Sequence, residues 1–594
     1  MSNIFVFLCA ATMALSGVSA EVKVVERINL WPSLNDVPDR QTHQKAVRHG
    51  EKVRAGAEGA MPYLEWYTPV NPSNNVSSCI ILLGGGGYNV CAGKNLFNRI
   101  AGRLIERGVT CVSLVYRTPR PKGCEIYRSA WQDAQRAVRL VRSLAKQRGY
   151  SEEKIGVLGF SAGAHLSVLL ATSSQSEAYA AKDRLDEVPC HINWAVPLYP
   201  AYSLSDGLSG PNTRNGDSPD VVLSSAFKFD AKTCSMCLFH AGKDIHSPIA
   251  STKIYRKLRT RKIPSELHLY PDLGHDFFSA AKPGTGAYSW FDRVEEYLMQ
   301  MGFLGNIAKK ERIFERYPSD EDRKTYEKEF IWPKGKIPDV QTHQDGLPYI
   351  EWHIPSNLTT KAIQIIFSGG SYNSNSPESS EVMPVRRYLN AKGMTVVTMC
   401  YRSPRPFAPL MKHASAWQDL QRAVRIVRSQ AARRGLDPDR IGIMGSSAGG
   451  HLALLGAVSS LSRSYGDIDE TDGISCSVQW AVAVYPAYTI VQGVGTRIIS
   501  NEIHEAFPLE TLSKELAFDK ATCPVLFIHG DKDTTVTAIC SVAPWEHMRK
   551  IGVQSELHTF AHANHSFERL TSPGTGAYSY MDRIWEFLTA KGLK

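Results

Sequence analysis

Two copies of a Gly-x-Ser-x-Gly pentapeptide, each between an apolar run and a helical pattern, constrain the fold of this chain more than any other feature. GFSAG at residues 159–163 follows the apolar run 155–158 and precedes the helical pattern 164–170. GSSAG at residues 445–449 repeats that arrangement. A turn this sharp between a strand and a helix strains the backbone of the central serine and holds its hydroxyl above a sheet. We therefore predict that Ser161 and Ser447 are two nucleophiles.

The whole chain of 594 residues is a tandem repeat. DRQTHQ at 39–44 returns as DVQTHQ at 339–344, WQD at 131–133 returns at 417–419, YPAY at 199–202 returns at 485–488, and PGTGAYS at 283–289 returns at 573–579. Each unit is about 290 residues long, which is too long for a solenoid repeat. The sequence therefore predicts two complete domains, residues 21–306 and 329–594, joined by a charged linker at 307–328.

Each copy alternates apolar runs with helical patterns. In the first copy we expect strands at 79–83, 110–116, 194–199, 237–240 and 267–270, and helices at 130–144, 251–258 and 293–301. Near-continuous apolar strands separated by helices are typical of a mostly parallel sheet covered on both faces. The predicted fold class is α/β, with two tandem domains of this kind.

The composition is that of an ordinary soluble globular protein, with 43% hydrophobic and 21% charged residues. The net charge is +10, but no long Lys/Arg block occurs, so nucleic acid is not an expected partner. The balance favours mild attraction to acidic surfaces or polysaccharides.

The first 20 residues have the features of a secretory signal, with an apolar core at 4–15 and the small-residue pattern VSA at 18–20. No Lys or Arg precedes the core, and a retained membrane anchor is the alternative, although the run is short for a span. We expect a secreted or periplasmic protein with no membrane association after cleavage.

Eleven cysteines remain after the signal. The pairs Cys190/Cys234 and Cys476/Cys523 each begin two successive buried strands, so a disulfide in each half and buried reduced thiols are both open. The CxxC at 234–237 has no second copy, so no metal and no cofactor are expected.

A serine nucleophile needs a base and an orienting acid, which follow it in the order Ser, Asp or Glu, His in folds of this kind. His275 and His565 each lie in a loop between a strand and the last helix. Asp244 aligns with Asp533 in the repeat, whereas Asp531 aligns with a glycine. We therefore predict the triads listed here: Ser161, Asp244, His275 and Ser447, Asp533, His565.

Backbone N–H groups must stabilise the oxyanion of the tetrahedral intermediate. One donor is expected from the residue after each serine, and the others from the loop after an earlier strand, GGGGYN at 84–89 and SGGSYN at 368–373. The predicted oxyanion donors are Gly86, Gly87 and Ala162 in the first copy and Gly370, Ser371 and Ala448 in the second.

Repeated tyrosines lie near the same edge of the sheet, where ligands bind in open α/β folds. These are Tyr88, Tyr199 and Tyr202 in the first copy and Tyr372, Tyr485 and Tyr488 in the second. An aromatic wall for a sugar or acyl group and core packing are both open. Arg117 with Asp133, and Arg402 with Asp419, are expected to form structural ion pairs.

With these motifs in view, each half resembles the bacterial acetyl xylan esterase and feruloyl esterase branch of the α/β-hydrolases. The likeness covers nearly all of both domains and includes Trp-Pro at Trp31 and Trp332, the Gly-Gly-x-Tyr loop, QDxQRAVR from Gln132 and from Gln418, and Gly-x-Ser-Ala-Gly. The resemblance implies hydrolysis of O-acyl groups, acetyl first, on polysaccharide such as xylan. The second copy departs at Ser368, Ser371 and Asn564.

Two other hypotheses stay open. One domain could be the active esterase while the other serves polysaccharide binding or assembly. A serine peptidase of similar fold is less favoured, because no propeller or large lid segment precedes either domain.

Overall fold

The computed structural model describes residues 22, 24–39, 61–67, 77–121, 123–205, 221–281, 284–305, 309, 326–339, 347–406, 410–458, 462–491 and 511–592. The predicted signal peptide and most of the predicted linker lie outside these residues. The chain forms two compact units, Met1–Pro283 with Ala287–Asn306, and Gly284–Gly286 with Ile307–Lys594, called here the first and second domains.

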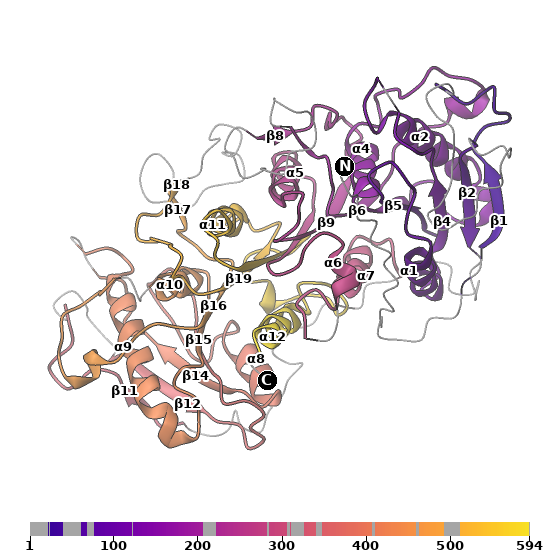
Figure 1. Cartoon of the computed structure of the whole chain (residues 1–594). Helices are drawn as coiled ribbons and strands as arrows, with labels where there is room; N and C mark the ends of the chain where they lie inside the picture. Colours follow the sequence, from indigo (N-terminus) through magenta and orange to yellow (C-terminus); the bar gives the residue numbers. More distant parts are fainter. Residues whose placement is uncertain are drawn as a thin grey trace, which may run out of the picture. The chain divides into compact units, whose positions relative to one another are not determined.

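In the first domain the described strands pair in the order β1-β2-β4-β3-β5-β6-β9-β10 (Figure 1). Strands β1 and β2 are antiparallel at one edge, and the pairs from β4 to β10 are parallel. The strands are β1 Val24–Asn29, β2 Tyr63–Tyr67, β3 Cys79–Leu83, β4 Thr110–Val115, β5 Ile155–Phe160, β6 Trp194–Leu198, β9 Ser235–Ala241 and β10 Glu266–Tyr270. A short hairpin, β7 Leu204–Ser205 with β8 Val222–Leu223, stands apart from this sheet.

The second domain repeats this order as β11-β12-β14-β13-β15-β16-β19-β20, again antiparallel only at the first edge. Its strands are β11 Glu329–Phe330, β12 Tyr349–His353, β13 Ile363–Phe367, β14 Thr395–Cys400, β15 Ile441–Ser446, β16 Trp480–Val484, β19 Val525–Gly530 and β20 Ser555–Phe560, with a separate hairpin of β17 Ile490–Val491 and β18 Thr511–Leu512.

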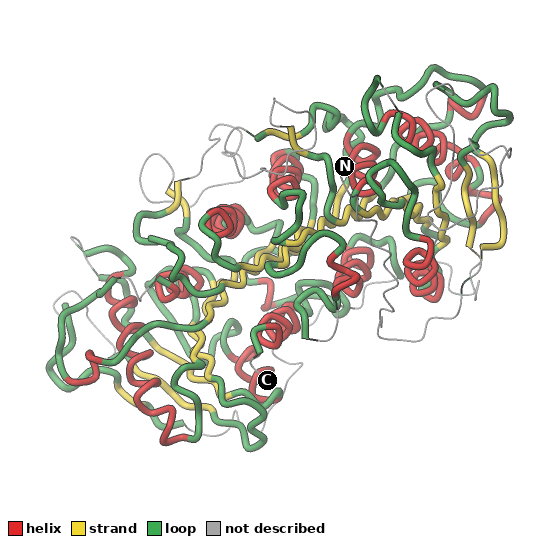
Figure 2. Tube along the Cα trace, in the orientation of Figure 1, coloured by secondary structure: helices red, strands yellow, loops and turns green. Residues whose placement is uncertain are grey.

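Helices cover both faces of each sheet (Figure 2). The first domain has α1 Lys94–Glu106, α2 Arg128–Ser143, α3 Ala145–Arg148, α4 Ala162–Thr172, α5 Ile249–Thr260, α6 Phe277–Ala280 and α7 Trp290–Gln300. The second has α8 Met383–Ala391, α9 Ala414–Ala431, α10 Ala448–Ala457, α11 Ile539–Lys550 and α12 Tyr580–Ala590. The predicted α/β fold is therefore confirmed in both halves, and the expected strands of the first copy coincide with β3, β4, β6, β9 and β10.

Apolar spacing and buried charge together fix α2 against the first sheet. Its buried side chains recur at helical spacing and include Ala130, Ala134, Ala137, Val138 and Val141. The predicted ion pairs are present: Arg117 lies 2.9 Å from Asp133, and Arg402 lies 2.9 Å from Asp419, with all four side chains buried. Because a buried charge without a partner is strongly unfavourable, these pairs fix how the strand end meets the helix.

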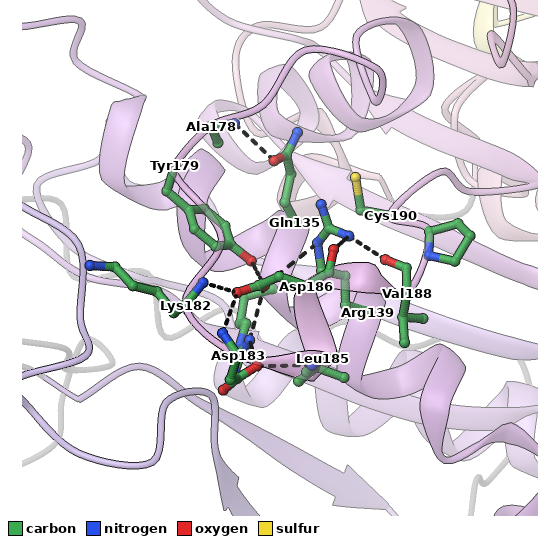
Figure 3. A network of polar contacts seen from close by, with 12 residues as sticks. Gln135, Arg139, Ala178, Tyr179, Lys182, Asp183, Leu185, Asp186, Val188 and Cys190 are labelled. Carbon is green, nitrogen blue, oxygen red and sulfur yellow. Dashed lines mark hydrogen bonds and ion pairs between the residues drawn. The ribbon is translucent and has the colours of Figure 1, made fainter.

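A polar network joins α2 to the short 3-10 helix η3, Arg184–Glu187 (Figure 3). Asp183 caps η3 by accepting from the N–H of Leu185 at 2.9 Å, and Asp186 accepts from the N–H of Lys182 and from the hydroxyl of Tyr179. Arg139 donates to the carbonyl oxygens of Asp186 and Val188. These contacts fix the connection between α4 and β6.

None of the eleven cysteines after the predicted signal forms a disulfide, so the disulfide alternative is wrong for both pairs. The thiol of Cys190 donates instead to the carbonyl oxygen of Ser174 at 3.2 Å. Burial raises the pKa of the Cys190 thiol, which favours its protonated form. Within the part of the chain that the structure describes, no helix combines the length and the apolar character needed to cross a membrane.

Candidate active sites

Ser161 and Ser447 occupy strained turns between a strand and a helix. Their φ angles are 54° and 55°, with ψ of −115° and −118°, which is rare for residues other than glycine. A Cβ atom at Gly159 would lie 2.2 Å from the carbonyl oxygen of Gly163, and one at Gly163 would lie 2.2 Å from that of Leu83. Glycine is therefore required on both sides of the first serine, because strand and helix approach too closely for a side chain.

The predicted triad of the first domain comes together in space. The hydroxyl oxygen of Ser161 lies 2.8 Å from Nε2 of His275, and Nδ1 of the same ring lies 2.9 Å from each carboxylate oxygen of Asp244. Asp244 follows β9 and His275 follows β10, so neighbouring parallel strands deliver both side chains to one edge of the sheet. This is the geometry of a hydroxyl, its base and the acid that orients the base.

The second domain repeats the arrangement with slightly different distances. Nε2 of His565 lies 3.1 Å from the hydroxyl oxygen of Ser447, and Nδ1 lies 2.7 Å from Oδ2 of Asp533. Asp533 is the carboxylate that contacts the imidazole, as the repeat predicts. Its other oxygen accepts from the N–H groups of Thr535 and Val536 at 2.8 and 2.7 Å.

Both orienting aspartates are held in the ionised form. Burial alone would raise the pKa of Asp244, but contacts with His240 and His275 outweigh it and lower the pKa well below its ordinary value. Burial is likewise outweighed at Asp533, whose pKa is lowered by His529 and His565. An ionised carboxylate at Nδ1 fixes the tautomer in which Nε2 accepts the serine proton.

The loop predicted to bind the oxyanion has the same conformation in both domains. Gly86 and Gly370 have φ angles of 106° and 101°, and their carbonyl oxygens accept from Asn89 and Asn373 at 3.0 and 2.9 Å. Ser371 adopts φ of 55° where the first copy has Gly87. Ala162 and Ala448 are the first residues of α4 and α10, so they too lie where the sequence analysis expects them.

Gly85 and Gly369, which were not among the predicted donors, lie close to the two serines. A Cβ atom at Gly85 would lie 3.3 Å from Cβ of Ser161, and one at Gly369 would lie 2.8 Å from Cβ of Ser447. A run of glycines gives no sign of which one meets the serine, so only the fold could single out these positions.

Four of the six predicted substrate-binding tyrosines are buried, two in each domain. The hydroxyl of Tyr88 lies 2.7 Å from Nδ1 of His165, and that of Tyr372 lies 2.8 Å from Nδ1 of His451. The rings of Tyr199 and Tyr485 pack 4.8 and 4.6 Å from the imidazoles of His275 and His565. These four therefore support the loop and the base. Tyr202 and Tyr488 are half-buried and remain the accessible members of the set.

The two sites differ most in what lies beside the nucleophile. In the first domain Phe160 packs against Phe97 and Phe278, with ring centroids 6.1 and 4.9 Å apart. In the second domain Ser446 and Glu568 stand where the first has Phe160 and Phe278, and Glu381 lies just before α8. A comparison of the two copies could have found this exchange of an aromatic cluster for two carboxyl groups, which motif spacing does not signal.

The two glutamates are buried and act on each other. Oε2 of Glu381 accepts from the backbone N–H of Gly369 at 2.5 Å, and the hydroxyl of Tyr485 donates to Oε1 of Glu568. Burial raises the pKa of Glu381. Burial, and repulsion by Glu381, raise the pKa of Glu568 to about 8, so Glu568 is largely protonated at neutral pH.

Comparisons with known proteins agree with this organisation. The BD-FAE family matches residues 64–248 and 351–546. The chain is 23% identical over 253 residues to an acetylxylan esterase of Xylanibacter ruminicola, covering 40% of this chain and 46% of the relative. It is 25% identical over 203 residues to endo-1,4-beta-xylanase B of Butyrivibrio fibrisolvens, covering 32% of this chain and 31% of that one. The chain thus spans less than half the length of these curated relatives.

Among solved structures, an acetyl ester-xyloside bifunctional hydrolase from Caldicellulosiruptor lactoaceticus is 25% identical, with 45% of this chain and 94% of that chain covered and a TM-score of 0.36. A propionate-bound esterase from Thermogutta terrifontis is 26% identical, with 47% and 98% covered and a TM-score of 0.36. The family match occurs once in each domain and together spans more than half of the 594 residues. The protein therefore belongs to the BD-FAE family and carries two tandem α/β-hydrolase domains.

Proposed function

We propose that this protein is an exported serine carboxylic-ester hydrolase that removes acyl groups, acetyl first, from a polysaccharide such as xylan, with one Ser-Asp-His triad in each domain. The observation that carries the proposal is the duplicated contact between serine and imidazole, 2.8 Å in the first domain and 3.1 Å in the second. An acylated oligosaccharide is a substrate of the same class.

The geometry supports acyl transfer through the serine. As the hydroxyl of Ser161 attacks the ester carbonyl, Nε2 of His275 takes its proton, and the ionised Asp244 stabilises the imidazolium that forms. The N–H of Ala162 and those of the glycine loop are the donors for the oxyanion, and one such donor is worth about 10²–10³-fold in kcat in enzymes of this type. The alcohol leaves with the proton from His275. Water, activated by the same ring, then releases the acid.

Support for a polysaccharide substrate comes from the relatives and from charge. The names of two relatives refer to xylan, as an acetylxylan esterase and as an endo-1,4-beta-xylanase. The net charge of +10 favours mild attraction to acidic surfaces or acidic polysaccharides. Half-buried Tyr202 and Tyr488 give each site an aromatic surface on which a sugar ring can stack.

A second candidate function, in which only the first domain is catalytic and the second binds polysaccharide, has one observation in its favour. In the second domain Glu381 engages the N–H of Gly369 beside Ser447, and its carboxylate is an unfavourable neighbour for a developing oxyanion. The matching stretch of the first domain, Leu96 and Phe97 in the first turn of α1, is apolar.

The experiment is an assay on 4-nitrophenyl acetate, followed by acetyl-xylan and a panel of peptides. The proposal predicts release of acetate from both esters and no cleavage of peptides. Single variants Ser161→Ala and Ser447→Ala then assign the turnover to each domain, and a peptide-cleaving protein with no esterase activity would reject the proposal.

A further inference from the structure

His413, His451 and Glu515 meet beside the predicted oxyanion loop of the second domain. His413 is the residue before α9, His451 lies in α10 one turn after Ser447, and Glu515 follows β18. Nδ1 of His413, Nε2 of His451 and a carboxylate oxygen of Glu515 all lie within 4.8 Å of one another. Three segments that are separate in the sequence thus bring three potential metal-ligand atoms close together.

The two imidazole nitrogens have no hydrogen-bond partner among the described residues, although His413 is 3% exposed and His451 is fully buried. They lie 3.7 and 3.4 Å from Oε1 of Glu515, beyond the 2.7–3.2 Å of an N–H···O bond. Buried polar atoms without a partner are costly. Donors bound to one tetrahedral zinc ion at 2.0–2.1 Å lie about 3.4 Å apart, so these separations fit a shared ion better than they fit direct bonds.

The donor set suits a divalent cation. Two imidazole nitrogens and one carboxylate oxygen are ligands that zinc takes in proteins. A cationic neighbour is Lys412, whose ammonium lies over the ring of Tyr488.

The first domain serves as an internal control. It keeps the contact between Tyr88 and His165, but Tyr127 replaces His413 and Ala226 replaces Glu515. The ring of Tyr127 packs 5.2 Å from that of His165, so an aromatic contact fills the space there. Two of the three donors are therefore particular to the second domain.

We propose that His413, His451 and Glu515 form a zinc-binding site of the second domain, with water in the fourth position. This inference does not depend on ester hydrolysis and departs from the expectation of a metal-free chain. The hydroxyl of Tyr372, 2.8 Å from Nδ1 of His451, is the outer contact that orients the ligand ring. Because Tyr372 adjoins Gly370 and Ser371, bound zinc would also stiffen the predicted oxyanion loop.

The test measures zinc in the full chain, prepared without a histidine tag, stripped with EDTA, loaded with zinc chloride and dialysed. Elemental analysis should find one zinc per chain, and calorimetry should give a matching stoichiometry. Changing His413→Tyr or Glu515→Ala, which installs the residues of the first domain, should remove that zinc. Glu515→Gln, which keeps the side-chain volume, should lower affinity at least about tenfold, and Tyr372→Phe about tenfold.

His165→Gln in the first domain is the matched control and should keep one zinc per chain. Cys237→Ser, in the other described group of potential ligands, should keep it as well. Circular dichroism establishes that each variant is folded. The proposal is overturned if the loaded wild-type chain holds no zinc after dialysis, or if folded Glu515→Gln and Glu515→Ala retain wild-type zinc content and affinity.

Discussion

Glu381 accepts a hydrogen bond from the backbone N–H of Gly369, with 2.5 Å between oxygen and nitrogen, in a stretch where the first domain has the apolar Leu96 and Phe97. A Cβ atom at Gly369 would touch both this carboxylate and Cβ of Ser447. Glu381 therefore anchors the loop beside Ser447, whereas aromatic side chains pack beside Ser161 in the first domain. The two sites share a catalytic geometry and differ in what supports it.

We predict that Glu381→Ala lowers kcat of the second site about tenfold, because a hydrogen bond to a charged group contributes roughly 1.5–3 kcal/mol to holding the loop. The assay uses the Ser161→Ala background, in which only Ser447 turns over. Glu381→Gln keeps an acceptor and should retain most of the activity. Phe97→Ala, assayed in the Ser447→Ala background, is the matched change in the first domain. Unaltered turnover in Glu381→Ala would exclude an anchoring role.

The raised pKa of Glu568, about 8, predicts a pH-dependent stability of the second domain. Between the unfolded value of about 4.5 and 8, the folded state binds more protons than the unfolded state, so this group's contribution to stability falls as pH rises through that window. Glu568→Gln mimics the protonated form, so the free energy of unfolding of this variant should fall less with pH. Urea unfolding of the wild type and the variant from pH 5 to 8 measures that free energy. Parallel pH dependences of the two proteins would contradict a raised pKa at Glu568.

Gly163→Ala should destabilise the first domain by at least about 2 kcal/mol, because overpacking against a rigid backbone cannot relax. The added Cβ would lie 2.2 Å from the carbonyl oxygen of Leu83. Gly473→Ala is the control, since no atom lies within 4 Å of its new Cβ. Thermal unfolding compares the two variants with the wild type. Equal melting temperatures for all three would show that the turn is looser than described.

Because no disulfide joins these cysteines, reductant should leave stability unchanged. None of the eleven cysteines after the predicted signal is in a disulfide, and burial raises the pKa of Cys234 above its ordinary value. Unfolding curves with and without dithiothreitol should superimpose, and titration of the denatured protein should count eleven thiols. A lower count, or a loss of stability on reduction, would restore the disulfide alternative.

The sequence was sufficient to predict the fold and the side chains that converge at each serine because these features leave local signals. Each nucleophile lies in a strand–turn–helix pattern, and each histidine and aspartate follows an apolar strand in a fixed order. The repeat also allows each residue to be compared with its counterpart in the other copy. That comparison favours Asp533, which aligns with Asp244, over Asp531, which aligns with a glycine.

Other features of the sites depend on contacts that no local pattern encodes. Glu381 and Glu568 reach the second site from the start of α8 and from the loop after β20, and each looks like an ordinary polar residue in sequence. His413, His451 and Glu515 belong to three separate elements and converge only in the fold. The state of Cys190 and Cys234 depended on the geometry of two strand ends, which strand prediction does not supply.

The central claim is that each domain has its own working serine, and the most direct measurement is kcat for an acetyl ester in Ser161→Ala, Ser447→Ala and the double variant. Each single replacement should cost its own domain about 10⁴-fold in kcat and leave the other domain's turnover intact. The account predicts two partial activities that add to the wild-type rate, with almost none left in the double variant. Complete loss of turnover in Ser161→Ala alone would contradict it and leave the second domain without catalysis.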